Sequence, residues 1–180
     1  MLVGVRIIAG EYRSRSLAAP TGLDTRPTSD RLRETLFNVL APRIEGAVFL
    51  DLYAGSGAVG IEALSRRAER VTFVERAPKA LAVLRGNLER LGIGEGFRVD
   101  ARSVAAFLRR ASESTPKQEP HEVVFLDPPW DAAAEYEATL GMLGAVTTGL
   151  LAEGAVVIAE HRRKQRLEDR YGRLERTRLL

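Results

Sequence analysis

The chain has 180 residues, 45% of them hydrophobic, which is enough for one domain with a full core. It contains no cysteine and only two histidines, which excludes disulfides, thiolate catalysis and cysteine-held metal sites and argues against a histidine-built one. The net charge is +3 and most cations are arginines, a composition suited to phosphate recognition. No segment has the pattern of a signal peptide or membrane span, so we expect a cytoplasmic protein without membrane contact. We also expect a monomer that uses no metal.

The first segment, residues 5 to 20, alternates loosely between apolar and polar positions. This pattern predicts a short hairpin or an extended arm laid against the main body. Arg6, Arg13 and Arg15 would give that arm a basic face.

A helix is predicted from about 29 to 40, after turn and capping residues and before Pro42, which is expected to end it. Its apolar stripe is expected at Leu32, Leu36, Val39 and Leu40. Arg31 and Arg33 lie beside that stripe and near Arg26, so three guanidiniums would gather close to the start of the helix. The alternative for these arginines is an ordinary solvated helix face.

From residue 47 onward, strands and helices are predicted to alternate, which is typical of a parallel sheet with helices on both sides. The strands are expected at 47–52, 71–75, 97–99, 122–126 and 155–159. The helices are expected at 58–67, 78–91, 103–111 and 132–143, with a hairpin at the end of the chain. Residues 1–180 would then form a single α/β domain, with residues 1–42 as an extension packed on it.

A glycine-rich segment follows the first of these strands and opens a helix. Gly55, Gly57 and Gly60 fit the Gly-x-Gly-x-x-Gly spacing that lets a backbone approach a nucleotide closely. Glu75 ends the next strand, where a carboxylate can accept both hydroxyls of a ribose. A ribose-bearing cofactor is therefore expected.

Asp51, four residues before the first glycine, helps to choose between nicotinamide dinucleotides and S-adenosylmethionine. A carboxylate there would attract the ammonium group of S-adenosylmethionine but repel a pyrophosphate. The sequence therefore favours the sulfonium cofactor. The alternative is a carboxylate that caps backbone amides of its own loop.

The sequence Asp127-Pro128-Pro129-Trp130 comes directly after the apolar strand 122–126. Open α/β folds bind ligands at that edge of the sheet, and the two prolines restrict the backbone of the motif. We expect a site for a flat, amine-bearing base. The alternative is an ordinary loop start followed by a tryptophan of the core.

Four segments together closely resemble the RsmD family: 6–10, 26–38, 51–65 and 127–130. The block 26–38 is far more specific to this family than the glycine loop or the Pro-Pro motif. Members of the family methylate the exocyclic N2 of one guanine in bacterial small-subunit ribosomal RNA, using S-adenosylmethionine. The resemblance implies a Rossmann-like class I methyltransferase fold with a seven-stranded, mostly parallel sheet whose last strand is antiparallel.

The resemblance also implies roles for individual residues. The expected cofactor-binding residues are Asp51, Tyr53, Ala54, Gly55, Ser56, Gly57, Glu75, Arg76 and Ser103. Ser103 stands where the family commonly has an acid or asparagine for the adenine amino group, and Asp100 precedes it by three residues. In the extension 1–42, the expected RNA-binding residues are Arg6, Arg13, Arg15, Arg26, Thr28, Arg31 and Arg33.

An exocyclic purine amine is a poor nucleophile, because its lone pair is delocalised into the ring. We expect the Asp127 side chain and the Pro128 carbonyl to accept its hydrogens and Trp130 to stack on the base, so these three are the expected catalytic residues. The target base would have to be unpaired or flipped out of its helix.

Three other functions stay open. The same four-residue motif serves DNA amino methyltransferases that act on adenine N6 or cytosine N4, although 180 residues leave little room for a DNA-reading domain. A nucleotide-binding dehydrogenase is disfavoured by Asp51. A nucleotide- or RNA-binding module without catalysis is disfavoured by the intact 127–130 motif.

Overall fold

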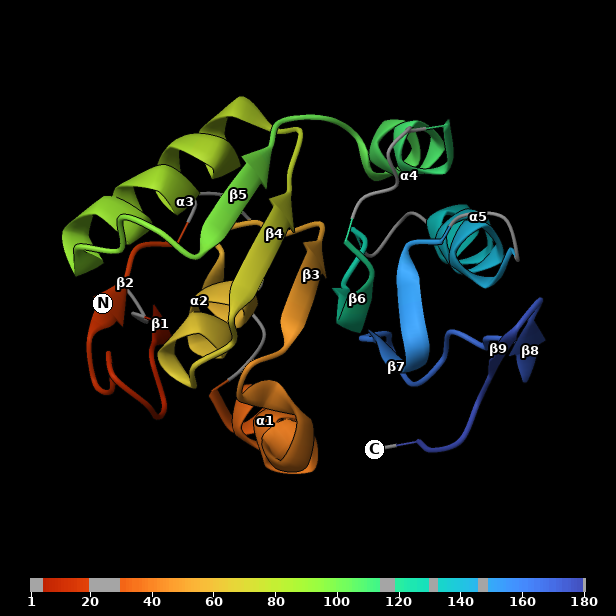
Figure 1. The fold of residues 1–180 in the computed structure, drawn as a ribbon, viewed down its shortest axis with the longest axis horizontal. Helices are drawn as coiled ribbons and strands as arrows, with labels where there is room; N and C mark the ends of the chain where they lie inside the picture. The colour runs from red at the N-terminus through yellow and green to blue at the C-terminus, as the bar shows by residue number, and fades with distance from the viewer. Residues whose placement is uncertain (1–4, 20–29, 114–118, 130–132, 146–148, 180) are drawn as a thin grey trace.

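The computed structural model describes residues 5–19, 30–113, 119–129, 133–145 and 149–179. Its centre is a five-stranded sheet in the order β5-β4-β3-β6-β7, in which every neighbouring pair is parallel (Figure 1). The strands of this sheet are β3 (Val48–Leu52), β4 (Arg70–Val74), β5 (Phe97–Asp100), β6 (His121–Leu126) and β7 (Leu151–Ala159).

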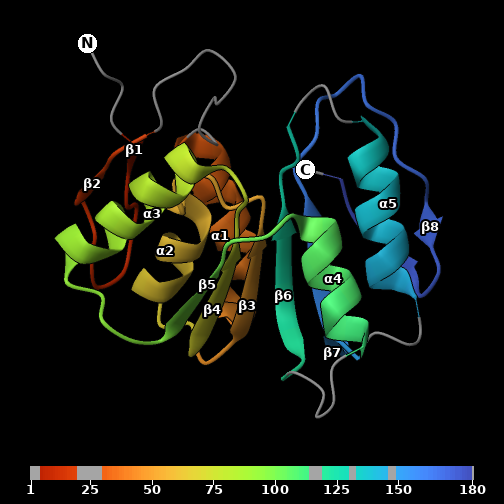
Figure 2. The same ribbon diagram turned by 90° about the horizontal axis from the view of Figure 1, so that it is seen from above.

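Helices cover both faces of the sheet, as Figure 2 shows. They are α1 (Asp30–Ile44), α2 (Ala58–Ser65), α3 (Pro78–Leu91), α4 (Val104–Glu113) and α5 (Ala133–Gly144). Helices α1 to α3 pack on one face, and α4 and α5 pack on the other. None of the described helices is long and apolar enough to cross a membrane.

The central strand β3 is buried at all five of its positions. Side chains of a strand alternate between its two faces, so Phe49 joins the core under α1 to α3 and Leu50 joins the core under α4 and α5. A strand buried on both faces needs a continuous apolar run, and Asp51 interrupts this one. That interruption marks the end of the sheet where the site lies.

The order of the strands places the site. The chain runs from β3 outward through β4 to β5, then returns to pair β6 with the other side of β3. The loops after β3 and β6 therefore leave the same edge in neighbouring positions, where open α/β sheets bind their ligands. Asp51 pairs with Phe125 in the register, two residues before Asp127.

The expected seven strands and antiparallel last strand are not found in the described part of the chain. The two strands that follow β7 are β8 (Arg170–Tyr171) and β9 (Leu174–Glu175), and they pair antiparallel with each other in a separate two-stranded sheet. This hairpin packs on α5, where a Cβ on Gly144 would lie 1.8 Å from the Tyr171 carbonyl oxygen. Contact with α5 therefore takes the place of pairing with the sheet edge.

Helix α1 differs from its prediction in length and in orientation. It continues through Pro42 to Ile44, because the side chain of Ile44 is buried in the core and this packing outweighs one lost backbone hydrogen bond. Leu32 and Val39, expected in the apolar stripe, are exposed. The buried face instead consists of Arg33, Leu36, Phe37, Leu40 and Ile44.

The predicted N-terminal hairpin is confirmed as β1 (Val5–Arg6) paired antiparallel with β2 (Ser16–Leu17). Buried polar side chains of the main body hold it. Glu62 of α2 accepts hydrogen bonds from the backbone N–H groups of Ile8, at 2.8 Å, and of Ala9, at 3.0 Å. Ser65 of the same helix accepts one from the Tyr12 N–H. The hairpin is thus a fixed part of the domain.

Candidate active site

The glycine loop after β3 is closely packed at two glycines and open at the third. A Cβ on Gly57, whose φ is +79°, would lie 2.2 Å from Leu84 Cδ1, and a Cβ on Gly60 would lie 2.3 Å from the Phe73 ring. Among the residues that the structure describes, a Cβ on Gly55 would meet only the Tyr53 carbonyl oxygen within 4 Å, at 3.9 Å. Gly57 and Gly60 therefore let the loop pack directly on the core, and Gly55 faces open space where a ligand can approach.

Glu75, directly after β4, joins the glycine loop to the start of α3. Its Oε2 accepts a hydrogen bond from Gly55 N–H at 2.9 Å, and its Oε1 accepts from the N–H groups of Arg76 and Ala77 at 2.8 Å each. A carboxylate has about four lone-pair positions, so Glu75 keeps acceptor capacity for hydroxyl groups.

Asp51 is buried, and its Oδ2 accepts a hydrogen bond from Gly60 N–H at 2.9 Å, in the first turn of α2. Capping of a backbone amide, the alternative role considered for Asp51, is therefore present. Burial raises the pKa of Asp51 to about 7, and the charge of Glu75 adds to the rise against the opposing Gly60 hydrogen bond.

Asp127 follows β6 at the same edge of the sheet. Its Oδ1 is buried and has no hydrogen-bond partner among the residues that the structure describes. Burial is the main cause that raises the pKa of Asp127 to about 8, and the charges of Glu160 and Asp51 contribute to that rise. An unpaired buried acceptor is costly, typically by about 1–3 kcal/mol, so it marks a position that suits a hydrogen-bond donor from a ligand.

The charge of Glu75 thus acts on Asp51, and that of Asp51 acts on Asp127. Among the described residues no cationic side chain forms an ion pair with any of the three. Like charges near one another disfavour ionisation. A cationic ligand would relieve this repulsion, and an anionic one would increase it.

Other expected cofactor residues lie around the same edge. The hydroxyl of Tyr53, which has a φ of 62°, bonds to Glu135 Oε2 at 2.6 Å and to Thr139 Oγ1 at 2.7 Å on α5. Ala54 is buried, and its N–H donates a hydrogen bond to the Val74 carbonyl at 3.0 Å, which extends the pairing of β3 with β4. Arg76 is exposed beside Glu75.

The expected adenine contact has a structural role in this arrangement. Ser103 Oγ accepts a hydrogen bond from the Ala106 N–H at 3.3 Å, so it caps the start of α4. Asp100 is buried and accepts hydrogen bonds from Arg98 and Arg102, and these bonds outweigh the cost of burial and lower its pKa. Asp100 is therefore already neutralised by the protein.

Asn87 of α3 is a site residue that the sequence analysis missed. Its buried amide donates hydrogen bonds to the carbonyl oxygens of Ser56, at 2.9 Å, and of Ala18, at 3.0 Å. Its oxygen accepts from the Ala18 N–H, at 2.8 Å, and from Arg90. One side chain therefore fixes the N-terminal hairpin and the glycine loop relative to each other.

Replacing Asn87 with aspartate should weaken both the fold and the loop. The change removes two donors and leaves a carboxylate facing two buried carbonyl oxygens. We expect a loss of about 2–4 kcal/mol in the free energy of unfolding and weaker binding of S-adenosylhomocysteine. Urea unfolding and calorimetric titration measure the two effects. The control is Asn38→Asp on the exposed side of α1, and equal behaviour of the two variants would contradict the role.

The arginines expected to bind RNA lie in different places. Arg33 is fully buried: it donates to the Arg6 carbonyl and to Asp30 Oδ1, and its Nε lies 3.9 Å from Glu62 Oε2. The expectation of an exposed, phosphate-binding Arg33 is wrong, because the side chain ties α1 to the hairpin and to α2. Arg31 and Arg6 are exposed, and Arg6 pairs with Asp30.

Arg13 and Arg15 are exposed near the turn of the hairpin. That turn is held by Ser65, the last residue of α2, and Arg15 donates to the carbonyl of Arg90 near the end of α3. Both helices start at the glycine-loop edge, and α3, with 14 residues, is about 20 Å long. The structure therefore does not bring Arg13 and Arg15 together with Asp127. Arg26, Thr28 and Trp130 lie outside the described residues.

Glu160 and Tyr136 also belong to this edge and were missed. Glu160 follows β7, and its N–H donates to the Leu126 carbonyl at 2.9 Å. Tyr136 of α5 is buried and donates its hydroxyl hydrogen to the Glu160 carbonyl at 2.7 Å. The signal that would have found Glu160 is the one used for Asp127, an acidic residue directly after a parallel strand.

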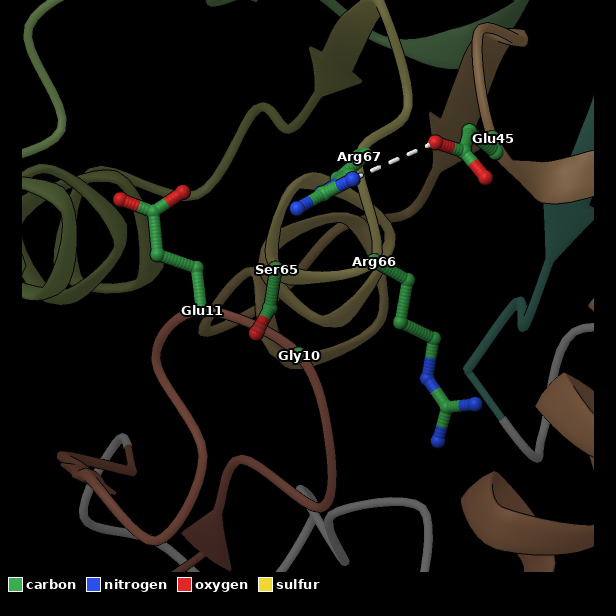
Figure 3. Close-up of a pocket in the computed structure, with 6 residues that line it drawn as sticks. All are labelled: Gly10, Glu11, Glu45, Ser65, Arg66 and Arg67. Carbon is green, nitrogen blue, oxygen red and sulfur yellow. Dashed lines mark hydrogen bonds and ion pairs between the residues drawn. The ribbon is translucent and has the colours of Figure 1, made fainter.

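A hollow of about 570 Å³ lies at the far end of α2 from the glycine loop (Figure 3). Arg67 pairs there with Glu45, and Arg66 pairs with Glu62 and stacks on Phe37, so both guanidiniums already have partners within the protein. Among the described residues, no group of three acidic or histidine side chains is placed to hold a metal ion.

Comparison with known proteins identifies the family. The family described as "Conserved hypothetical protein 95" matches residues 5–179. The Escherichia coli (strain K12) protein "Ribosomal RNA small subunit methyltransferase D" is 42% identical over 156 residues, covering 87% of this chain and 74% of that protein. The chain belongs to the RsmD family.

Solved structures agree with this assignment. A hypothetical protein from Thermus thermophilus superposes with a TM-score of 0.77 at 34% identity, covering 92% of this RsmD-family chain and 90% of that one. An SAH-bound methyltransferase from Podospora anserina has a TM-score of 0.60 at 16% identity, covering 73% and 53%, which is a likeness of fold alone. The fold is that of the class I methyltransferases, as expected.

Proposed function

We propose that this chain transfers a methyl group from S-adenosylmethionine to the exocyclic N2 amine of a guanine in small-subunit ribosomal RNA. The observation that carries the proposal is the buried Oδ1 of Asp127 beside the glycine loop, which has no hydrogen-bond partner within the described part of the chain. Family membership and the name of the Escherichia coli relative support the RNA substrate. A cytoplasmic, monomeric enzyme without metal remains part of the proposal.

The residues at the sheet edge fit the proposed cofactor. The loop is open at Gly55, Glu75 keeps acceptor capacity for a ribose, and Asp51 lies where a positive charge is favoured. When bound, S-adenosylmethionine supplies a methyl group activated by the positive sulfonium. In this proposal, Ser103 or the backbone next to it contacts the adenine amino group of the cofactor.

Asp127 and Pro128 would act on the acceptor amine. Hydrogen bonds from the amine to the Asp127 carboxylate and the Pro128 carbonyl hold its lone pair toward the methyl carbon and stabilise positive charge on nitrogen. The bound cofactor would supply the methyl group and leave as an uncharged thioether, and the Asp127 carboxylate would take the proton that the methylated amine releases. No covalent link to the protein is needed. Trp130 is proposed to stack on the base.

The test supplies labelled S-adenosylmethionine with deproteinised small-subunit RNA and with assembled subunits from a strain that lacks the modification. Digestion to nucleosides should yield labelled N2-methylguanosine. Label in N6-methyladenosine or N4-methylcytosine, or on DNA offered in parallel, would point to another amino methyltransferase. Absence of label with competitive NADH binding would point to a dehydrogenase.

Cofactor binding should be linked to proton release. The pKa values of about 7 for Asp51 and about 8 for Asp127 mean that both carboxyls carry protons at pH 6. A cation beside them lowers both pKa values, so binding expels protons and becomes tighter as the pH rises from 6 to 8. Calorimetry in buffers of different ionisation enthalpy measures the protons released. The uncharged thioether of S-adenosylhomocysteine should release fewer, and equal release by both ligands would contradict the expectation.

A further inference from the structure

We propose that the basic turn after β7, formed by Arg163, Lys164 and Arg166, binds phosphates of the substrate RNA on the β6–β7 side of Asp127. This inference rests on the proposed function and adds a second contact surface to it. The turn lies outside the residues that the sequence analysis expected to bind RNA.

The position of the basic turn follows from the sheet. Ala159, the last residue of β7, pairs with Leu126, the residue before Asp127. The next residue, Glu160, hydrogen-bonds to the Leu126 carbonyl, and the chain then enters the turn. The turn is closed by a hydrogen bond from the Gln165 N–H to the Arg162 carbonyl at 2.8 Å. The basic turn therefore leaves the sheet at the edge that carries Asp127.

Tyr136 confirms that this segment stays near the site. Burial raises the pKa of Tyr136 to about 12, the charges of Asp127 and Glu160 add to the rise, and the charge of Arg162 opposes it. The same hydroxyl therefore lies within electrostatic reach of Asp127 and of Arg162, the residue directly before the basic turn.

The three cations are exposed and available. Arg163, Lys164 and Arg166 form no ion pair and no side-chain hydrogen bond with any residue that the structure describes. No acidic residue lies between 161 and 167. Farther along, Arg170 pairs with Glu175 and Arg176 pairs with Asp169. The chain thus pairs Arg170 and Arg176 of its terminal hairpin with carboxylates and leaves the basic turn positive.

The basic turn also fills a place that the N-terminal arginines leave empty. Arg33 is buried, and Arg13 and Arg15 lie near the far ends of α2 and α3. In Figures 1 and 2, the hairpin β1–β2 lies beside α2 and α3, and β7 lies away from it, at the edge of the sheet opposite β5. A nucleotide held at Asp127 has phosphates on both sides, so cations after β7 complement those of the N-terminal part.

The partner fits by its chemistry. Guanidinium groups bind phosphate oxygens through two parallel hydrogen bonds, and lysine acts as a mobile point charge. Contacts of this kind hold the RNA backbone whatever its sequence and release counterions, so they appear in the salt dependence of binding. Each lost phosphate contact lowers the slope of log K against log salt by roughly 0.7–0.9.

The experiment compares two triple variants of the full chain. The test variant is Arg163→Ala, Lys164→Ala and Arg166→Ala. The control removes three exposed cations elsewhere, by Arg85→Ala, Arg109→Ala and Arg173→Ala, so that the net charge is the same. Binding to deproteinised small-subunit RNA and to assembled subunits is measured at several KCl concentrations, with the single-turnover rate at saturating RNA and the Kd of S-adenosylhomocysteine.

Affinity is compared on the RNA substrate that the wild type methylates. At moderate salt, we expect the test variant to bind this RNA about tenfold more weakly than the control does, and its slope of log K against log salt to be lower by about 2. The single-turnover rate at saturating RNA and the Kd of S-adenosylhomocysteine should match those of the control. Equal affinity and slope in the two variants would overturn the basic turn as a phosphate site while leaving the methyl transfer in place. A wild type that methylates neither RNA substrate would overturn the proposed function and this inference with it.

Discussion

Replacing Asp127 with alanine is expected to abolish methyl transfer, lowering the single-turnover rate by at least about 10³-fold. The change removes the side-chain acceptor that the buried Oδ1 provides and leaves the amine without its main hydrogen-bond partner. The glycine loop and Glu75 are unchanged, so the Kd of S-adenosylhomocysteine should stay close to that of the wild type. Single-turnover assays with labelled cofactor, paired with calorimetric titration, measure the two quantities.

The control for this change is Asp169→Ala, an exposed aspartate of the segment before β8 that pairs with Arg176. It should keep the wild-type rate. Turnover retained in Asp127→Ala, or lost equally in both variants, would defeat the role assigned to Asp127. Asp127→Asn separates shape from charge, because it keeps one acceptor oxygen but cannot carry the negative charge.

Replacing Glu62 with alanine is expected to cost about 3–5 kcal/mol in the free energy of unfolding. Glu62 is fully buried, accepts two backbone hydrogen bonds from the N-terminal hairpin, pairs with Arg66 and lies 3.9 Å from the buried Arg33. Its removal leaves Arg33 as a buried cation with less compensation and two amide groups without acceptors. Urea unfolding followed by circular dichroism measures the loss.

Glu62→Ala should also loosen the hairpin, which trypsin would then cleave faster after Arg13 and Arg15. The control is Glu45→Ala, which removes an exposed partner of Arg67 and should change the unfolding free energy by less than about 1 kcal/mol. If Glu62→Ala unfolds at the same urea concentration as the control, the buried network does not hold the hairpin.

Local patterns predicted most of the elements. Strand β6 and helices α2 and α3 were placed within two residues of their observed bounds, because apolar periodicity and terminal residues such as Pro78 and Gly92 are local signals. Gly92 indeed ends α3 with a φ of 73°. The prediction that Pro42 ends the first helix was wrong, because burial of Ile44 extends α1 past the proline.

The candidate site was predicted from the ends of its strands. Asp51, Glu75 and Asp127 each come after or within an apolar run, and parallel strands bring such positions to one edge. Asn87 carried no such signal. It lies in the middle of a helix, and its importance arises only because the hairpin and the glycine loop, distant in sequence, both pack against it.

By itself, the sequence determined the α/β class, the order of the elements and the carboxylates at the edge of the sheet, because periodicity and spacing along one segment encode them. Only the tertiary structure decided that Arg33 is buried between α1, the hairpin and α2, that Arg13 and Arg15 lie far from Asp127, and that the chain enters the basic turn from the sheet edge that carries Asp127. The physical reason is that the burial of a side chain depends on which distant segments pack over it. A helix with arginine at one position looks the same in sequence whether that face meets water or Glu62.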